Sequence, residues 1–250
     1  MRQSLYKIRN DKLSKSMRIA VISDLHGREI TEIVRILSEA KPDLILAPGD
    51  ICERIDSHSQ SNERGFSLLS AAAKIAPTFY SLGNHEIGGT GSWAMGFRTR
   101  RPSRADWSTE NAERLKMGGA VLLDDTYVLY DGLAIGGLTS GILNDGGEPD
   151  SSWLGEFSRA GCPKILLCHH PEYYEKYLSG YNVDLIVSGH AHGGQWRFFG
   201  RGVFAPGQGI FPKYTRGIYD GRLVVGTGLK KGGIIPRIFN SPEIVLIDIN

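Results

Sequence analysis

Hydrophobic residues along this chain fall into short runs, and several of these runs are continuous instead of alternating with polar residues. Continuous apolar runs of four to eight residues are typical of strands that are buried on both faces of a sheet. The pattern predicts strands at residues 18–23, 43–47, 78–81, 133–138, 164–168, 184–187, 223–226 and 244–249.

Between these runs, hydrophobic residues recur with the period of a helix. Ile30, Ile33, Val34 and Leu37 have the spacing i, i+3, i+4, i+7, and this helix is expected to end before Pro42. Further helices are predicted at residues 68–75, 111–116 and 171–178. The alternation of strands and helices predicts an α/β fold built in layers.

Two segments depart from this alternation. Residues 88–106 are rich in Gly and Arg, and they are expected to form a long loop. Residues 193–233 are rich in Gly with scattered aromatic residues, which predicts loops and short strands folded over one end of the sheet.

Length and charge limit the possible organisation and partners. The 250 residues, 41% of them hydrophobic, suffice for one domain over residues 1–250, because the polar segments that must converge span residues 24–192. The net charge of +2 predicts no specific nucleic-acid binding. Residues 1–16 are locally basic, and they are expected to form a solvated extension or an edge strand, with contact to a membrane surface or a phosphate-rich partner as the alternative.

Cysteine content and hydropathy bear on the compartment. Cys52, Cys162 and Cys168 form no CxxC pair and too small a set for a disulfide framework, which fits a reducing environment. No apolar run approaches the ~20 residues that span a bilayer, and no signal-peptide core is visible. We therefore expect a cytoplasmic protein, with peripheral membrane contact as a further option, while the sequence leaves the oligomeric state open.

Six of the seven histidines lie in short segments that directly follow predicted strands. Because ligands of open α/β sheets bind beyond the carboxyl ends of the strands, these segments are expected to converge on one site. In an extended backbone, residues i and i+2 point the same way, so the pairs Asp24/His26 and His190/His192 can each reach that site. The flanking glycines are expected to let the backbone turn sharply there; they are Gly27, Gly49, Gly83 and Gly189.

The donor types in these segments indicate a metal site. Two carboxylates, one amide oxygen and four imidazoles are available, and they belong to Asp24, His26, Asp50, Asn84, His169, His190 and His192. Such a set exceeds the needs of one ion, but with one bridging carboxylate it suits two ions about 3.5–4 Å apart. Mixed nitrogen and oxygen donors without thiolate favour Mn, Fe, Zn or Co, and the net positive charge of such a centre favours an anionic phosphoryl substrate.

The same segments resemble the signature of the calcineurin-like metallophosphoesterase superfamily. The matching series is Asp24-x-His26, Gly49-Asp50, Gly83-Asn84-His85-Glu86, His169-x-Pro171 and Gly189-His190-x-His192. The resemblance implies a four-layer α/β/β/α sandwich in which a hydroxide that bridges two divalent ions attacks phosphorus.

The resemblance also implies a role for each residue. One ion would be held by Asp24, His26, Asp50 and His192, and the other by Asp50, Asn84, His169 and His190, with Asp50 bridging. His85 would be the catalytic histidine and Glu86 the partner that orients it. The His-x-Pro pattern selects His169 over His170, which leaves His170 as a wall residue.

Branches of the superfamily differ in substrate. Gly193-Gly194-Gln195 and the closing Pro236-Arg237 and Ser241-Pro242-Glu243-Ile244 resemble the bacterial phosphodiesterase branch that includes UDP-2,3-diacylglucosamine pyrophosphatase-like enzymes. Many members of that branch carry an N-terminal membrane anchor, whereas none is expected here.

The expected activity is hydrolysis of a phosphodiester, phosphomonoester or diphosphate small molecule. Two alternatives are a protein serine/threonine phosphatase and a non-catalytic binding scaffold with the same fold. Arg54 stands where the protein phosphatases place a phosphate-binding arginine, but Ile55 and Leu82 replace their glycine and second arginine. Residues 88–106 follow His85 closely and could form a lid, in which Arg98 would bind a phosphate; a solvated loop is the alternative.

Overall fold

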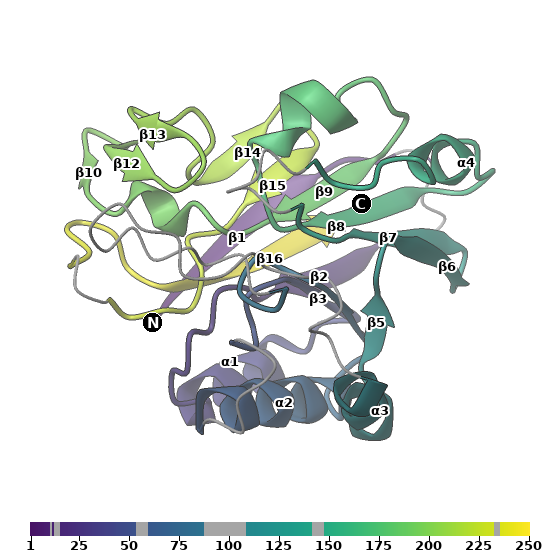
Figure 1. Ribbon diagram of the computed structural model, residues 1–250, viewed down its shortest axis with the longest axis horizontal. Helices are drawn as coiled ribbons and strands as arrows, with labels where there is room; N and C mark the ends of the chain where they lie inside the picture. Colours follow the sequence, from purple (N-terminus) through teal and green to yellow (C-terminus); the bar gives the residue numbers. More distant parts are fainter. Residues whose placement is uncertain (11, 13–15, 54–59, 88–108, 142–147, 233–235) are drawn as a thin grey trace.

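Two six-stranded sheets form the centre of the computed structural model, which describes residues 1–10, 12, 16–53, 60–87, 109–141, 148–232 and 236–250 (Figure 1). The first sheet has the order β1 (Arg2–Ile8), β16 (Glu243–Ile249), β2 (Met17–Val21), β3 (Leu44–Pro48), β4 (Thr78–Ser81) and β5 (Val121–Leu123). The second has the order β14 (Gly217–Tyr219), β15 (Leu223–Val225), β9 (Leu185–Ser188), β8 (Lys164–Cys168), β7 (Leu133–Leu138) and β6 (Thr126–Tyr130).

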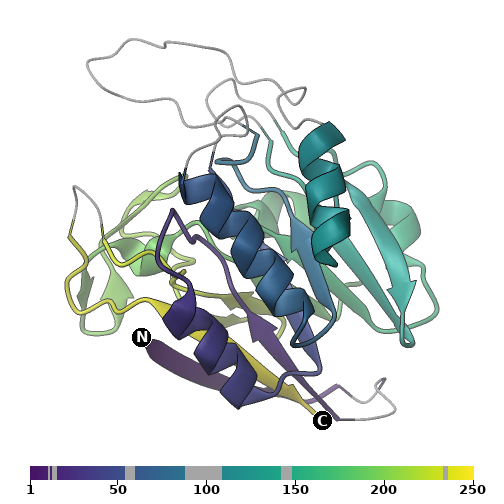
Figure 2. The same ribbon diagram turned by 90° about the horizontal axis from the view of Figure 1, so that it is seen from below.

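Helices cover the outer face of each sheet. On the first sheet these are α1 (Thr31–Ala40), α2 (Gln60–Ala73) and α3 (Thr109–Gly118), which Figure 2 shows side by side. On the second sheet they are α4 (Leu154–Ser158) and a π-helical turn (Tyr174–Leu178). The four-layer α/β/β/α order is therefore confirmed. Within the described part of the chain, no helix combines the length and the hydropathy needed to cross a membrane.

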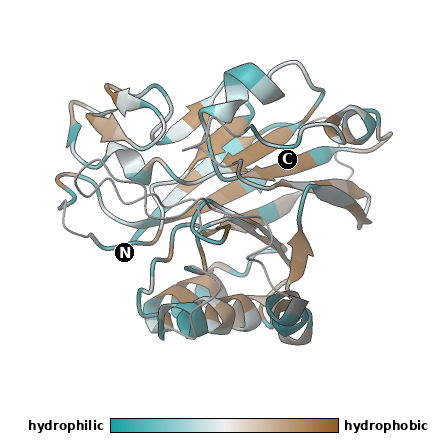
Figure 3. Ribbon diagram, viewed as in Figure 1, coloured by the Kyte–Doolittle hydropathy of each residue, from teal (hydrophilic) through white to brown (hydrophobic). Residues whose placement is uncertain are grey.

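The strands at the centre are buried on both faces, which explains their continuous apolar sequence. In β3, Leu44 and Leu46 pack between the two sheets, while Ile45 and Ala47 pack under the helices. Figure 3 shows the resulting hydrophobic band along the strands of both sheets. Alternate residues of one strand thus contribute to two separate cores.

Every strand predicted from a continuous apolar run is present, within one or two residues of its expected bounds. β6 was not predicted, because its residues are half-buried or exposed and its sequence has no continuous buried run. The short elements expected between residues 193 and 233 are confirmed as a 3-10 turn (His192–Gly194) and four two-residue strands, β10 (Arg197–Phe198), β11 (Arg201–Gly202), β12 (Phe204–Ala205) and β13 (Gly209–Ile210). The basic N-terminal segment contributes β1, which pairs in parallel with β16 at the edge of the first sheet.

Candidate metal centre

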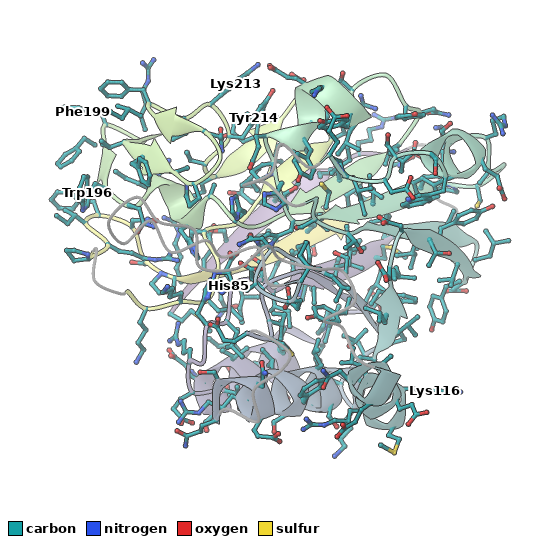
Figure 4. The ribbon with its side chains drawn as sticks, viewed as in Figure 1. His85, Lys116, Trp196, Phe199, Lys213 and Tyr214 are labelled. Carbon is teal, nitrogen blue, oxygen red and sulfur yellow. The ribbon has the colours of Figure 1, made fainter. Side chains whose placement is uncertain are left out.

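The expected metal ligands all lie in loops that leave the carboxyl ends of β2, β3, β4, β8 and β9. Strands β2, β3 and β4 are parallel neighbours in one sheet, and β8 and β9 are parallel neighbours in the other. Because parallel strands end at the same edge, each sheet directs its loops to one side. The two edges meet where His85 is labelled in Figure 4.

The backbone is left-handed at five of the seven expected ligands, so the extended conformation expected for the two i, i+2 pairs is wrong. The φ angles are 54° at Asp24, 45° at His26, 54° at Asp50, 62° at His190 and 46° at His192. Such a conformation costs a non-glycine residue on the order of 1–3 kcal/mol. The chain turns back after β2, β3 and β9, and this turn, not strand alternation, aims the side chains of these five ligands inward.

Two of the neighbouring glycines serve close packing and not, as expected, a sharp turn. Gly49 does turn, with φ of 80°. Gly83 and Gly189 have ordinary backbone angles, but a Cβ atom on Gly83 would lie 2.2 Å from Asp50 Oδ1, and one on Gly189 would lie 2.4 Å from Asp24 Oδ2. Any side chain at these two positions would therefore displace an expected ligand.

The carboxylate of Asp50 lies at the centre of the site. Its Oδ2 atom is 3.1 Å from His169 Nε2 and 3.8 Å from His26 Nε2, while Oδ1 accepts a hydrogen bond from the backbone N–H of His85 at 2.9 Å. Two groups of candidate ligands lie here, and within each group the ligand atoms are within 4.8 Å of one another. The first group is Asp24, His26 and His192, and the second is Asp50, His169 and His190.

Several buried polar atoms that could bind a metal have no hydrogen-bond partner in the described part of the protein. These atoms test whether metal ions fit the site. Among the described residues, no hydrogen bond reaches three such atoms: His26 Nε2, Asn84 Oδ1 and His190 Nε2. A buried polar atom without a partner costs on the order of 1–3 kcal/mol. Imidazole nitrogens and an amide oxygen that face one small volume are the ligands that divalent transition metals take.

In two imidazole rings, a hydrogen bond at Nδ1 leaves Nε2 available to bind a metal. His169 donates from Nδ1 to the carbonyl of Pro48 at 2.7 Å, and Nδ1 of His26 lies 3.1 Å from Glu53 Oε1. A proton on Nδ1 keeps the Nε2 lone pair free. His192 differs, because Arg237 Nη2 donates to its Nδ1 at 3.1 Å; this contact must break before a neutral ring can bind a metal through Nε2.

His85 has a different partner from the one expected. Its Nδ1 lies 2.7 Å from Glu53 Oε2, so Glu53, and not Glu86, orients the ring. This leaves Nε2 of His85 facing the centre, 3.8 Å from Asp50 Oδ2. One Glu53 carboxylate thereby holds both His85 and His26.

Glu86 instead ties two loops together under the metal centre. Its Oε2 accepts hydrogen bonds from the backbone N–H groups of Asp50 and Gly83, at 2.9 and 2.7 Å. Its Oε1 accepts from the N–H of Cys52 at 2.8 Å and from the Tyr80 hydroxyl at 2.6 Å. The sequence placed Glu86 beside His85 in the chain, but the turn points the two side chains apart.

The protonation states suit a cation site only in part. Burial favours the neutral form of Asp50, but the positive charges of His169, His85 and His26 outweigh it and hold the Asp50 pKa well below its usual range. Burial lowers the pKa of His190 well below its usual range, so its ring is neutral, as a metal ligand must be. Burial alone would lower the pKa of His169, but the Asp50 and Asp24 carboxylates raise it to about 10, so this ring must lose a proton before it can bind a metal. Burial would also lower the pKa of His85, yet the Asp50 and Glu53 carboxylates raise it to about 9.

His170 lies beside the second ligand group. Its ring centroid is 4.1 Å from that of His190, and its Nδ1 is 3.1 Å from Glu172 Oε1. These three residues also bring their ligand atoms within 4.8 Å of one another. The position agrees with a wall of the site.

Three expected contributors lie outside the described residues: Arg54, Arg98 and the candidate lid at residues 88–106. Conversely, sequence reasoning gave no role to Glu53 or Arg237, which both contact candidate ligands. The sequence could have indicated a site role for Glu53, since this carboxylate lies only three residues after Asp50, in the same strand-end loop.

Comparisons with known proteins identify relatives of this chain. Residues 17–194 match the family model of calcineurin-like phosphoesterases. The chain is 26% identical to the metallophosphoesterase Cj0846 of Campylobacter jejuni over 95% of this chain and 60% of that protein. It is 29% identical to the phosphodiesterase YaeI of Escherichia coli over 72% of this chain and 62% of that protein. It thus spans less than two thirds of both relatives.

Among solved structures, TT1561 of Thermus thermophilus is matched by this chain. The TM-score is 0.48 at 18% sequence identity, with 70% of this chain and 82% of that chain covered.

Proposed function

Since the chain belongs to the calcineurin-like phosphoesterase family, we propose that it hydrolyses a phosphodiester, phosphomonoester or diphosphate bond of a small molecule with two divalent metal ions. The name of the YaeI relative favours a diester among these substrates. Mn, Fe and Zn are the candidate metals, because the donor set mixes nitrogen and oxygen without thiolate. The alternative function of a protein serine/threonine phosphatase is not supported. Those enzymes have a second arginine where this chain has Leu82, and the Leu82 side chain is fully buried.

The observation that carries the proposal is the set of buried ligand atoms without a hydrogen-bond partner among the described residues; these atoms lie in the same site as the contact between His169 Nε2 and Asp50 Oδ2. Asp24, His26 and His192 would hold one ion, and Asn84, His169 and His190 the other, with Asp50 shared between them. When bound, the two ions would lower the pKa of water and neutralise phosphoryl oxygens.

The chain's own residues would do the rest of the work. Pro48 and Glu53 fix the tautomers of two ligand imidazoles, so the site is shaped before the substrate arrives. His85 presents Nε2 to the centre while Glu53 holds its other nitrogen. From this position His85 would place a proton or a positive charge on the oxygen that leaves phosphorus.

The test compares two variants with a matched control. Asp50→Asn should lose metal and activity together, because the shared ligand loses its charge. His85→Gln should keep its metal content and lose about 10²–10⁴-fold in kcat, the usual contribution of a general acid or base. Asp220→Asn, at an exposed turn, is the control and should match the wild type.

The assay measures hydrolysis of p-nitrophenyl phosphate and bis-p-nitrophenyl phosphate with Mn²⁺, and the metal content of each purified protein. Wild-type activity in metal-loaded His85→Gln would overturn the role of His85. Full metal content in Asp50→Asn, with full activity, would overturn the shared site.

A further inference from the structure

Exposed phenylalanines project from the short strands that follow His192. Phe199 is fully exposed in the turn after β10, Phe211 is 80% exposed after β13, and Phe239 is 81% exposed near the end of the chain. All three have left-handed backbones, with φ of 49°, 54° and 53°. Strained turns that hold large apolar side chains in water do not help folding, so this surface suggests a binding role.

These turns form one continuous surface, which we call the aromatic tip (Phe198, Phe199, Phe211 and Phe239). The rings of Phe198 and Phe239 are in edge contact, with centroids 5.9 Å apart. The second hairpin lies beside the first, because Phe211 lines one hollow together with Arg197, Gly200 and Arg201 of the first hairpin. Figure 1 shows β10, β12 and β13 grouped at one end of the molecule, and Figure 4 shows Phe199 at its outer edge.

The segment that carries the aromatic tip is strongly basic. Residues 193–242 contain eight Lys or Arg and one Asp, a net charge of +7, whereas the whole chain carries +2. The rest of the chain is therefore net acidic, and the excess of positive charge is concentrated in this segment.

A basic hollow adjoins the aromatic tip. It has a volume of about 360 Å³, and its lining includes Phe211 together with four cationic side chains, Arg197, Arg201, Lys213 and Arg216. Lys213 pairs with Glu175, and Arg216 with Glu243 at 3.2 Å. Within the described part of the chain, Arg197 and Arg201 have no carboxylate partner, so the hollow keeps a net positive charge.

We propose that this surface docks on an anionic phospholipid membrane. The aromatic tip would enter the interface, where aromatic rings are favoured, and the hollow would take the phosphate of one lipid headgroup. A bilayer fits better than a folded protein, because Phe199, Phe211 and Phe239 stand exposed on separate turns beside a basic hollow, an arrangement that suits an apolar interface bordered by phosphates. The charge of the surface complements anionic lipid.

Docking there would bring the metal centre to the membrane. The segment starts directly after His192, and Asn240, next to Phe239, donates from Nδ2 to the carbonyl of His192 at 2.7 Å. Access to the centre would then be governed by the lipid surface on this side. The inference concerns attachment, and it holds whichever ester the centre hydrolyses.

Vesicle flotation tests the proposal with the full chain at about 0.1 M salt. Vesicles of phosphatidylcholine alone are compared with vesicles that contain 30% phosphatidylglycerol, chosen as the anionic probe. The wild type should float with the anionic vesicles and much less with the neutral ones. Raising the salt to about 0.5 M should weaken binding, because it screens the attraction.

Substitutions test the aromatic tip and the basic hollow separately. Phe199→Ser and Phe211→Ser should each lower the partition coefficient about tenfold, as the loss of one buried aromatic ring predicts. Arg201→Glu should lower it more than fivefold on anionic vesicles only, since each basic charge near such a surface contributes about fivefold. Matched controls are Leu129→Ser and Met117→Ser, which remove side chains that are 72% and 80% exposed away from the tip.

Wild-type protein that stays with the soluble fraction would overturn the proposal, and so would equal losses in the control variants. Size-exclusion chromatography without vesicles addresses pairing of two copies through the tip. A dimer that Phe199→Ser dissociates, without vesicle binding by the wild type, would replace the membrane with a second chain. Hydrolysis of p-nitrophenyl esters in solution should stay unchanged in all these variants, which separates this test from that of the proposed function.

Discussion

Replacing Glu86 with Gln should destabilise the fold strongly, although the two side chains have nearly the same shape. The buried carboxylate accepts four hydrogen bonds, three from backbone N–H groups and one from Tyr80. Gln has one acceptor oxygen, so its NH₂ group must face one of the two donor pairs. If the NH₂ group faces Cys52 and Tyr80, the Tyr80 hydroxyl can turn to accept from it, so only the Cys52 N–H loses its acceptor, at about 1–3 kcal/mol. The N–H groups of Asp50 and Gly83 also exchange a charged acceptor for a neutral one, at about 1 kcal/mol each, which gives a total loss of about 2–6 kcal/mol.

Tyr80→Phe is a milder change to the same group of hydrogen bonds, and its loss of stability can be compared with that of Glu86→Gln. It removes one donor and leaves the carboxylate with three hydrogen bonds, so it should cost about 1.5–3 kcal/mol, the value of one hydrogen bond to a charged group. Glu39→Gln is the matched control for the change of charge. Its ion pair with Arg35 is exposed, and its loss should change stability by less than about 0.5 kcal/mol.

The assay is urea unfolding followed by far-ultraviolet circular dichroism, with a chelator present so that lost metal binding does not contribute. With a urea slope of about 2 kcal/mol/M, Glu86→Gln should unfold about 1–3 M earlier than the wild type. An unchanged midpoint would refute the idea that Glu86 ties the two loops together. A larger loss in Tyr80→Phe than in Glu86→Gln would refute the count of unsatisfied donors.

The remaining predictions concern the metal centre directly. Glu53→Gln should lower kcat or metal affinity about 10–100-fold with little change in KM, because it releases both His85 and His26; normal kcat and normal metal content would argue against a positioning role. Gly189→Ala should reduce bound metal, measured by mass spectrometry, because its Cβ would lie 2.4 Å from Asp24 Oδ2, and retention of two ions per chain would show that the loop can yield. Chelation of the wild type should lower the melting temperature, and excess Mn²⁺ should restore it in proportion to the logarithm of its concentration.

The layered α/β fold could be predicted because the sequence of each buried strand shows its burial without reference to its neighbours. A strand that is buried on both faces has a continuous apolar run, as in β3 and β8, whatever its neighbours are. The strands with mixed exposure, such as β6, have no such run, and only pairing with β7 makes β6 a strand. The α/β class therefore followed from the sequence, while the order of strands within each sheet did not.

The candidate ligands were also visible in the sequence, because each belongs to a residue type that binds metal and each follows a strand. Their backbone conformation was not visible, since the left-handed angles at Asp24 and His190 arise from the way each loop turns over the sheet edge. The unexpected roles of Gly83 and Gly189 have the same origin: each glycine packs against an aspartate from another loop.

The sequence by itself determined the strands that have continuous apolar runs, the set of candidate metal ligands and the reaction class that they suit, because residue type and spacing encode all three. Only the tertiary structure decided which carboxylate orients His85. Glu86 is adjacent in the chain, whereas Glu53 comes from a different strand end and lies 2.7 Å away. It likewise decided that turns from separate hairpins bring Phe199 and Phe211 beside one basic hollow. Contacts between loops depend on where the sheets place them, and that information is spread over the whole chain.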